Sequence, residues 1–132
     1  MGGADLESAI LNSANMFGTI LGSANLRGAK LENADLRMAQ LDFANLRNAC
    51  LVNADMREAH LINAEIPGAN LGSAKLQGAI LLGANLSESS LVSADLQDAI
   101  LSAADLTNAD LRYANLVGTA QQNTIWTGAI FG

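Results

Sequence analysis

The chain has 132 residues, with 7 Lys and Arg against 13 Asp and Glu, and its formal net charge is −6. A chain of this length is expected to form one domain, residues 1–132, and its acidic balance argues against direct binding to nucleic acid or to anionic lipid. Half of the residues are hydrophobic but only 4% are aromatic, so the apolar content comes mainly from Leu and Ala.

The first residues, MGGADLES, lack the basic and apolar segments of a signal peptide. No stretch approaches the roughly 18 consecutive apolar residues of a transmembrane helix, so we expect neither secretion nor a membrane span. The single cysteine, Cys50, excludes an internal disulfide and any site built from several cysteines. A lone thiol is typical of a reducing compartment, and a cytoplasmic location is therefore expected.

A five-residue repeat runs through the chain from its first residues. Stepping by five from Leu6 to Phe131 gives twenty-six positions, of which twenty are Leu and only Gln121 is polar. Two residues before each of them stands Ala in twenty-two cases and Thr or Ser in the other four. One large and one small apolar residue therefore recur together in every unit, with few exceptions.

A period of five excludes a helix or coiled coil. At about 100° per residue, successive large residues would be separated by about 140° around a helix and would form no stripe. In an extended segment, the small residue and the large residue two positions later point to the same side, and the residue between them points outward. We therefore predict short β segments, each followed by a two-residue turn.

The glycines agree with this turn. All twelve lie one or two residues after the large position of a unit. The second of these places is where a type II turn requires positive φ, which Gly or Asn supplies most easily, and Asn stands there in six units. The only proline forms the pair Pro67-Gly68, which is the preferred pair for the two central residues of a type II turn.

Units such as ADLES, ANLRG, ADLRM and ANLVG carry the repeat, and residues 4–118 follow it without an insertion. They resemble the A(D/N)LXX motif of the pentapeptide-repeat protein family. The resemblance implies an all-β fold, a right-handed quadrilateral parallel β-helix or solenoid with four units per coil and the large and small residues inside. At twenty residues and about 4.8 Å per coil, the chain would make about six and a half coils in a stack about 31 Å tall.

The pattern changes at both ends. It loosens in residues 119–132, but Trp126 and Phe131 keep the inward phase, and we expect them to form a C-terminal cap. At the N-terminus the repeat begins almost at once, which would leave an open edge and core. Because some members of the family form end-to-end dimers, the resemblance makes an end-to-end homodimer one expected assembly.

Four-sided stacking would place residues twenty apart above one another and sort the outward residues into columns. Two opposite columns are polar, and their acidic members are Asp5, Glu65 and Asp105 on one side and Asp35, Asp55 and Asp95 on the other. Arginines stand beside both columns. Such rows are typical of solvated ladders of hydrogen bonds and charge pairs, and the alternative interpretation is an acidic surface that mimics the DNA backbone.

Another side carries aliphatic residues in outward positions, although Gln40 and His60 interrupt their column. These residues are Ile20, Ile62, Ile80, Leu82 and Ile100. Exposed apolar patches often mark an interface, so the pattern indicates a candidate protein interface. The neutral alternative is that β-branched residues merely suit outward strand positions.

No catalytic, cofactor-binding or metal site is expected. His60 and Cys50 lack the base and orienting partner that nucleophilic catalysis needs. Asp35 and Asp55 would lie on adjacent coils, but a convex side offers no pocket for a substrate. The glycines follow the turn repeat and form no phosphate-binding loop. We therefore predict that the protein is not an enzyme.

The sequence thus predicts a non-catalytic structural or protein-interaction module with an unknown protein partner. The alternative that the resemblance implies is a DNA-mimicking modulator of a type II topoisomerase such as gyrase. Charge density argues against this alternative, because about 31 Å of B-DNA carries roughly 18 phosphate charges and the whole chain carries a net −6. The family is especially numerous in cyanobacteria, which by frequency alone suggests that setting.

Overall fold

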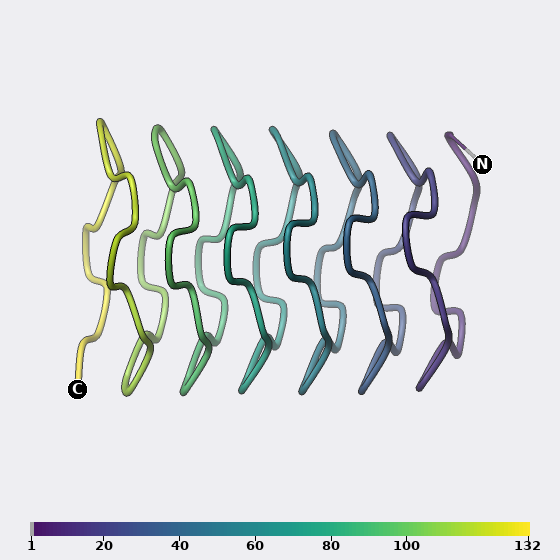
Figure 1. Ribbon diagram of the computed structural model, residues 1–132, viewed down its shortest axis with the longest axis horizontal. Coiled ribbons are helices and arrows are strands. Elements are labelled where there is room, and N and C mark those ends of the chain that lie inside the picture. The colour runs from purple at the N-terminus through teal and green to yellow at the C-terminus, as the bar shows by residue number, and fades with distance from the viewer. Residues whose placement is uncertain (1) are drawn as a thin grey trace.

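The computed structural model describes residues 2–132. Across these residues the chain contains no helix and no strand of several residues, and its regular β structure consists of twenty-two isolated parallel bridges, from Asp5–Asn25 to Asp110–Ile130. Every bridge joins residues twenty positions apart, so four five-residue units make one coil. Figure 1 shows the coils stacked along the long axis, with the two termini at opposite ends. The predicted parallel solenoid is confirmed.

Each coil has four sides, which we number in chain order by the residue that forms the bridge. The bridging residues of the first side are Asp5, Asn25, Asn45, Glu65, Asn85, Asp105 and Ile125. Those of the second side are Ile10, Lys30, Cys50, Asn70, Ser90, Asp110 and Ile130. Those of the third side are Asn15, Asp35, Asp55, Lys75, Asp95 and Asn115, and those of the fourth side are Ile20, Gln40, His60, Ile80, Ile100 and Ala120. A two-residue corner separates each side from the next.

Backbone hydrogen bonds between coils hold this register. The N–H of Asn25 donates to the carbonyl of Ala4 one coil before at 2.8 Å, and the N–H of Leu26 donates to the carbonyl of Asn45 one coil after at 2.7 Å. The N–H of Gly28 also reaches the next coil, and the N–H of Ala29 closes the turn on the carbonyl of Leu26 at 3.0 Å. The backbone therefore satisfies four of the five N–H groups in such a unit, and only the first corner residue needs another acceptor.

The large and small residues of the repeat point into the coil and form the core. From Leu21 to Leu111, every large residue at the five-residue spacing is at most 2% exposed. The small residues between Ala24 and Ala109 are buried beside them, and the single polar member, Ser89, donates its hydroxyl to the carbonyl of Leu86 at 2.6 Å. A narrow core of aliphatic side chains explains the low aromatic content of the sequence.

The second residue of every corner has positive φ, from Gly3 to Gly128, as a type II turn requires. Glycine occupies only eight of these places, and eighteen are non-glycine residues with φ between 54° and 63°. Asn and Ser tolerate this conformation, but Met38, Phe43, Ala103 and Tyr113 adopt it as well. The inward large residues and the bonds between coils therefore override local backbone preference.

The last residues keep the coil geometry although their sequence loosens. Bridges continue to Ile125 and Ile130. Trp126 is half-buried and packs against the core, and its ring lies 5.5 Å from that of Phe131 at a tilt of 52°. Phe131 itself is 54% exposed, so in this structure Trp126 covers the core more fully than Phe131 does.

The neighbours Leu81 and Leu82 give a matched test of the inward phase, because Leu81 is 1% exposed and Leu82 is 41% exposed. We expect Leu81→Asp to lower the free energy of unfolding by more than about 4 kcal/mol, because it removes core packing and buries a carboxylate without a partner. Thermal unfolding followed by circular dichroism measures the change. Leu82→Asp should leave a cooperative transition near the wild-type temperature, and equal behaviour of the two variants would contradict the assigned phase.

Ala103 gives a test of the strained corners, because it has φ of 59° without a side chain that could stabilise that conformation. We expect Ala103→Gly to raise the free energy of unfolding by about 0.5–1 kcal/mol, since the cost of positive φ exceeds the extra entropy of glycine in the unfolded chain. The melting temperature should rise by about 2–5 °C. Ser102→Gly, at the preceding corner position, should destabilise the protein.

Candidate functional site

The outward Asp and Asn residues of the repeat cap their own corners. In twelve units, a side-chain oxygen of the bridging Asp or Asn accepts the N–H of the first corner residue two positions later, at 2.9–3.4 Å. This is the N–H that the bonds between coils leave unpaired. Where the bridging residue is Glu65, the first corner residue is Pro67, which has no N–H. The preference for Asp or Asn in the repeat therefore has a structural cause.

Two of the three acidic side chains of the third side, Asp35 and Asp55, are neutralised by the corner arginines beside them. Arg37 binds Asp35 through Nε at 2.8 Å and Nη2 at 2.7 Å, and Arg57 binds Asp55 in the same way at 2.8 and 2.6 Å. The hydrogen bonds from Arg37 lower the pKa of Asp35 from 3.8 to about 2. Those from Arg57 lower the pKa of Asp55 as well.

The other members of the predicted acidic columns also have partners. Glu65 accepts Arg47 Nη2 at 2.8 Å and Asn85 Nδ2 at 3.2 Å. Asp95 accepts Gln77 Nε2 at 2.6 Å and Asn115 Nδ2 at 2.9 Å. Asp5 and Asp105 accept the side chains of Asn25 and Thr107, respectively. Several of these contacts join neighbouring coils, so parts of both columns form polar ladders along the solenoid.

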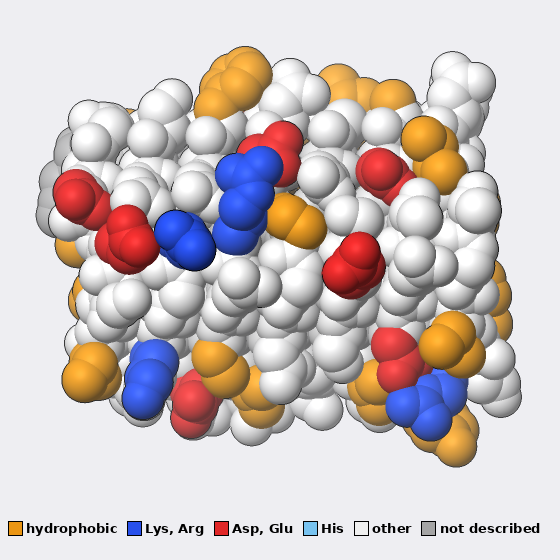
Figure 2. All heavy atoms as spheres, turned by 180° about the vertical axis from the view of Figure 1, so that it is seen from behind, with side chains coloured by type: hydrophobic (Ala, Val, Ile, Leu, Met, Phe, Trp, Pro, Cys, Tyr) orange, Lys and Arg blue, Asp and Glu red, His pale blue; other side chains and the backbone are white. Residues whose placement is uncertain are grey.

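The charge on these ladders is mixed. All five arginines of the chain take part in ion pairs with carboxylates. Figure 2 shows one long side on which acidic and basic side chains are interspersed, while hydrophobic side chains gather mainly toward its upper and lower edges. Such exposed pairs add little stability, but they break the row of like charges that a mimic of the DNA backbone would need.

The predicted aliphatic residues lie on two adjacent columns. Ile20, Ile80 and Ile100 are bridging residues of the fourth side. Ile62 and Leu82 instead occupy the first place of the corner between the fourth and first sides, so they border that side and do not belong to it. Ile62 and Ile80 are half-buried, and Leu82 and Ile100 are 41% and 37% exposed. Ile20 stands apart, because Gln40 and His60 separate it from Ile80.

Sequence reasoning missed the large apolar residues on the corners of the same side. Phe17 and Met38 lie on the corner before the fourth side, and Phe43 lies on the corner after it. All three are more than half exposed. Their phase in the five-residue repeat contains this information, since the first and second corner residues of a unit also face solvent. We call the fourth side with its two corners the fourth-side surface.

This surface contains every exposed large hydrophobic residue that the structure describes between residues 21 and 112, namely Met38, Phe43, Leu82 and Ile100. Phe17, Ile20 and Val117 extend the surface toward its two ends. The remaining exposed large hydrophobic residues are Ile10, in the first coil, and Tyr113, Ile125, Ile130 and Phe131, among the last twenty residues. The middle of the solenoid therefore presents its exposed large apolar side chains in one direction only.

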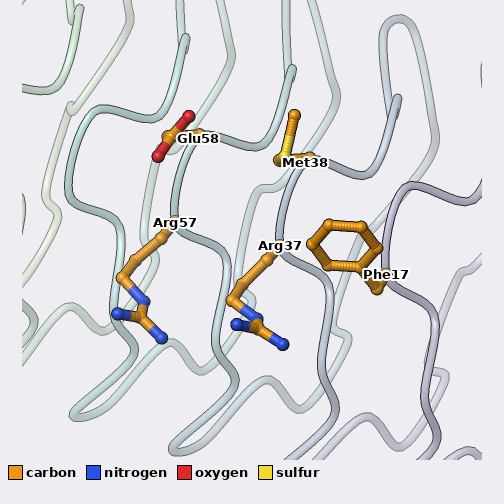
Figure 3. A pocket seen from close by; sticks show the side chains of 5 residues that line it. All are labelled: Phe17, Arg37, Met38, Arg57 and Glu58. Atoms are coloured by element: carbon orange, nitrogen blue, oxygen red, sulfur yellow. The ribbon is translucent and has the colours of Figure 1, made fainter.

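A shallow pocket of about 250 Å³ lies at the corner before the fourth side. In Figure 3, Arg37 and Arg57 extend in parallel to one side of this corner, and Met38 and Glu58 extend to the other. Phe17 lies beside Arg37, whose guanidinium carbon is 5.2 Å from the ring centroid, a cation–π contact. The guanidinium groups are already bound to Asp35 and Asp55, so the walls of the pocket are two neutralised cations, two apolar side chains and the carboxylate of Glu58.

The reactive side chains singled out in the sequence stand alone. The thiol of Cys50 donates to Glu32 Oε1 at 3.3 Å, and partial burial raises its pKa. His60 is exposed on the fourth side. Within residues 2–132, no three His, Cys, Asp or Glu side chains come together as a metal site requires. The described part of the chain also has no helix long and apolar enough to cross a membrane.

The five-residue repeat is also what this chain shares with known proteins. The family model for pentapeptide repeats matches in 8 copies over residues 1–37, 39–76, 69–108 and 89–120. No curated protein sequence matches the chain. Several solved structures do.

One of these structures is HetL, a pentapeptide repeat protein involved in heterocyst differentiation regulation, from the cyanobacterium Nostoc sp. strain PCC 7120. It is 26% identical to this chain, the match covers 98% of this chain and 75% of HetL, and the TM-score is 0.55. The pentapeptide repeat protein alr5209 of Nostoc PCC 7120 is 34% identical over 70% of this chain and 84% of its own, with a TM-score of 0.47. QnrB1, a plasmid-mediated fluoroquinolone resistance protein, is 16% identical over 99% of this chain and 85% of its own, with a TM-score of 0.37.

The ion pair of Asp35 predicts a pH dependence of stability. The pKa of Asp35 is about 2 in the folded protein and 3.8 ordinarily, so its contribution is complete above about pH 4 and is lost as the pH falls toward 2. We expect the difference in unfolding free energy between wild type and Asp35→Asn, which keeps the corner cap, to shrink over that range. In Arg37→Met, carboxyl NMR should show the Asp35 midpoint moving toward 3.8, and a midpoint that stays near 2 would contradict the assigned cause.

Proposed function

Because this chain belongs to the pentapeptide repeat family, we propose that it acts as a non-catalytic protein-interaction module that binds a partner through its fourth-side surface. The fold of the family is the right-handed quadrilateral β-helix, and residues 2–132 adopt it. The proposal includes a cytoplasmic location, where the thiol of Cys50 stays reduced.

The placement of the exposed large apolar residues carries this proposal. In the middle of the solenoid they lie on the fourth-side surface, whereas the other sides present capped Asp and Asn residues and ion pairs. When a partner covers solvent-exposed apolar side chains, the free energy of the complex is lowered. A backbone bonded from coil to coil also presents them on a rigid support, which limits the entropy lost on binding.

A non-catalytic role agrees with the geometry of the other groups. The pocket at the corner is shallow, and its arginines are bound to aspartates. His60 and Cys50 lie on different sides, and neither has a base and an orienting group arranged around it. No observation favours DNA mimicry over partner binding, because the acidic columns are interspersed with arginines and cap the corners of the coils.

Affinity capture from a native extract tests the proposal with Ile80→Asp/Leu82→Asp. Both residues are outward in the repeat, so the variant keeps every inward position, and thermal unfolding should show that it is folded. We expect wild type to capture a specific protein that the variant loses, because two carboxylates would oppose the burial of the apolar surface.

The matched control is Val52→Asp/Val92→Asp, which adds the same charge at the corner between the second and third sides. This control should keep the captured protein. Equal capture by wild type and the Ile80→Asp/Leu82→Asp variant would overturn the proposal. If the captured molecule were a second copy of the chain, the molar mass in solution would reveal it.

A further inference from the structure

The partner of the fourth-side surface can be described by its chemistry. We propose that this surface binds a basic, amphipathic segment of a partner protein. Aliphatic side chains of the segment pack on Ile80, Leu82 and Ile100, and its Lys or Arg side chains meet carboxylates at the edges of the surface. The inference rests on the proposed function, to which it adds the class of partner.

The apolar part of the surface is contiguous. Ile80 and Ile100 bridge each other on adjacent coils. Leu82 follows Ile80 by two residues along the chain, and Ile62 lies one coil before Leu82 in the same corner column. These four residues therefore occupy two neighbouring columns over three coils, which suits the apolar face of one amphipathic segment.

Three carboxylates without an ion pair stand on the corners that border this apolar part. Asp42 lies on the corner after the fourth side, and Glu58 and Asp98 lie on the corner before it. None of these three carboxylates takes part in an ion pair of residues 2–132. Acidic groups therefore flank the apolar residues on both edges, and cations of a partner would complement them.

Among the described residues, Arg37 and Arg57 are the only Lys or Arg side chains on the fourth-side surface. Each is held by an aspartate of the third side through two hydrogen bonds. In Figure 3 both guanidinium groups extend to one side of the corner, while Glu58 extends to the other. The arginines are thus neutralised and point away from the fourth side. The unpaired carboxylates therefore keep the electrostatic potential of the fourth side negative.

Backbone strain gives an independent reason to assign a binding role to this surface. Met38 and Phe43 are exposed, and both adopt positive φ, of 57° and 61°. Most other corners of the chain place Gly, Asn or Ser in the equivalent position, which suits this conformation better, and Tyr113 is the one bulky exception outside this surface. Folding alone disfavours an exposed bulky residue there, and such strain often occurs at binding sites. Met38 and Phe43 lie on the two corners that flank the fourth side in one coil, where they supply rigid apolar contacts.

The direct test uses a designed peptide of about 15 residues, with Leu on one helical face and Lys on the other, about 22 Å long. This length covers the three coil steps, about 14 Å, that separate the levels of Asp42 and Asp98. Titration of the isotope-labelled protein, followed by NMR, should give a saturable shift of the amides of Ile80, Leu82 and Ile100. The same peptide with Glu in place of Lys should not bind.

Two double variants separate local charge from net charge. Glu58→Gln/Asp98→Asn should weaken binding of the Lys peptide about five- to tenfold, because it removes two carboxylates at the edge of the site. Glu7→Gln/Glu88→Gln removes the same charge from the corner between the first and second sides and should change the affinity less than about twofold. Equal losses in the two variants would overturn the inference.

Phe43→Asn keeps the test independent of folding. The substitution relieves positive φ at a bulky residue, so the melting temperature should rise while the affinity for the Lys peptide falls. No binding of the Lys peptide, equal binding of the Glu peptide, or shifts confined to another side would each overturn the inference. If Ile80→Asp/Leu82→Asp loses a captured partner that Glu58→Gln/Asp98→Asn retains, the proposed function stands and the basic partner is wrong.

Discussion

The structure depends on one constraint, the twenty-residue register that the hydrogen bonds between coils impose. Each unit in the interior of the solenoid donates N–H groups to both neighbouring coils, and these bonds can form only when residue i lies above residue i+20. The register stacks large aliphatic side chains into continuous inward ladders, whose burial opposes the entropy lost by ordering the chain. The same register requires a sharp corner every five residues, and eighteen non-glycine residues adopt positive φ to make it.

The register also explains why the polar columns are poor candidates for a binding surface. The backbone leaves the N–H of the first corner residue without a partner in the coil, and an Asp or Asn two positions earlier is well placed to accept it. Three of the bridging aspartates are also held by an arginine two residues later, Asp35 by Arg37, Asp55 by Arg57 and Asp110 by Arg112. Their acidity therefore belongs largely to the structure of the solenoid, and an incoming partner would have to compete with these contacts.

The fourth side differs because its bridging residues include no Lys, Arg or Glu, and no Asp or Asn that caps a corner. Its exposed apolar residues have no structural task comparable to capping, and two of its bulky corner residues are strained. Rigid support, apolar side chains and flanking carboxylates occur together there. This combination is the reason for assigning the interaction to this surface and to a partner of basic, amphipathic character.

The amino-acid sequence by itself determined the repeat, the inward phase of the large and small residues and the place of the corners, because a period of five is compatible with short β segments and not with a helix. It also contained the aliphatic residues Ile80, Leu82 and Ile100. Only the tertiary structure decided which side each corner residue borders and which carboxylates are paired. Those properties arise from contacts between coils, such as Phe17 with Arg37 or Arg47 with Glu65, which join residues eighteen to twenty positions apart. The local sequence does not determine whether a carboxylate points toward such a neighbour or toward solvent.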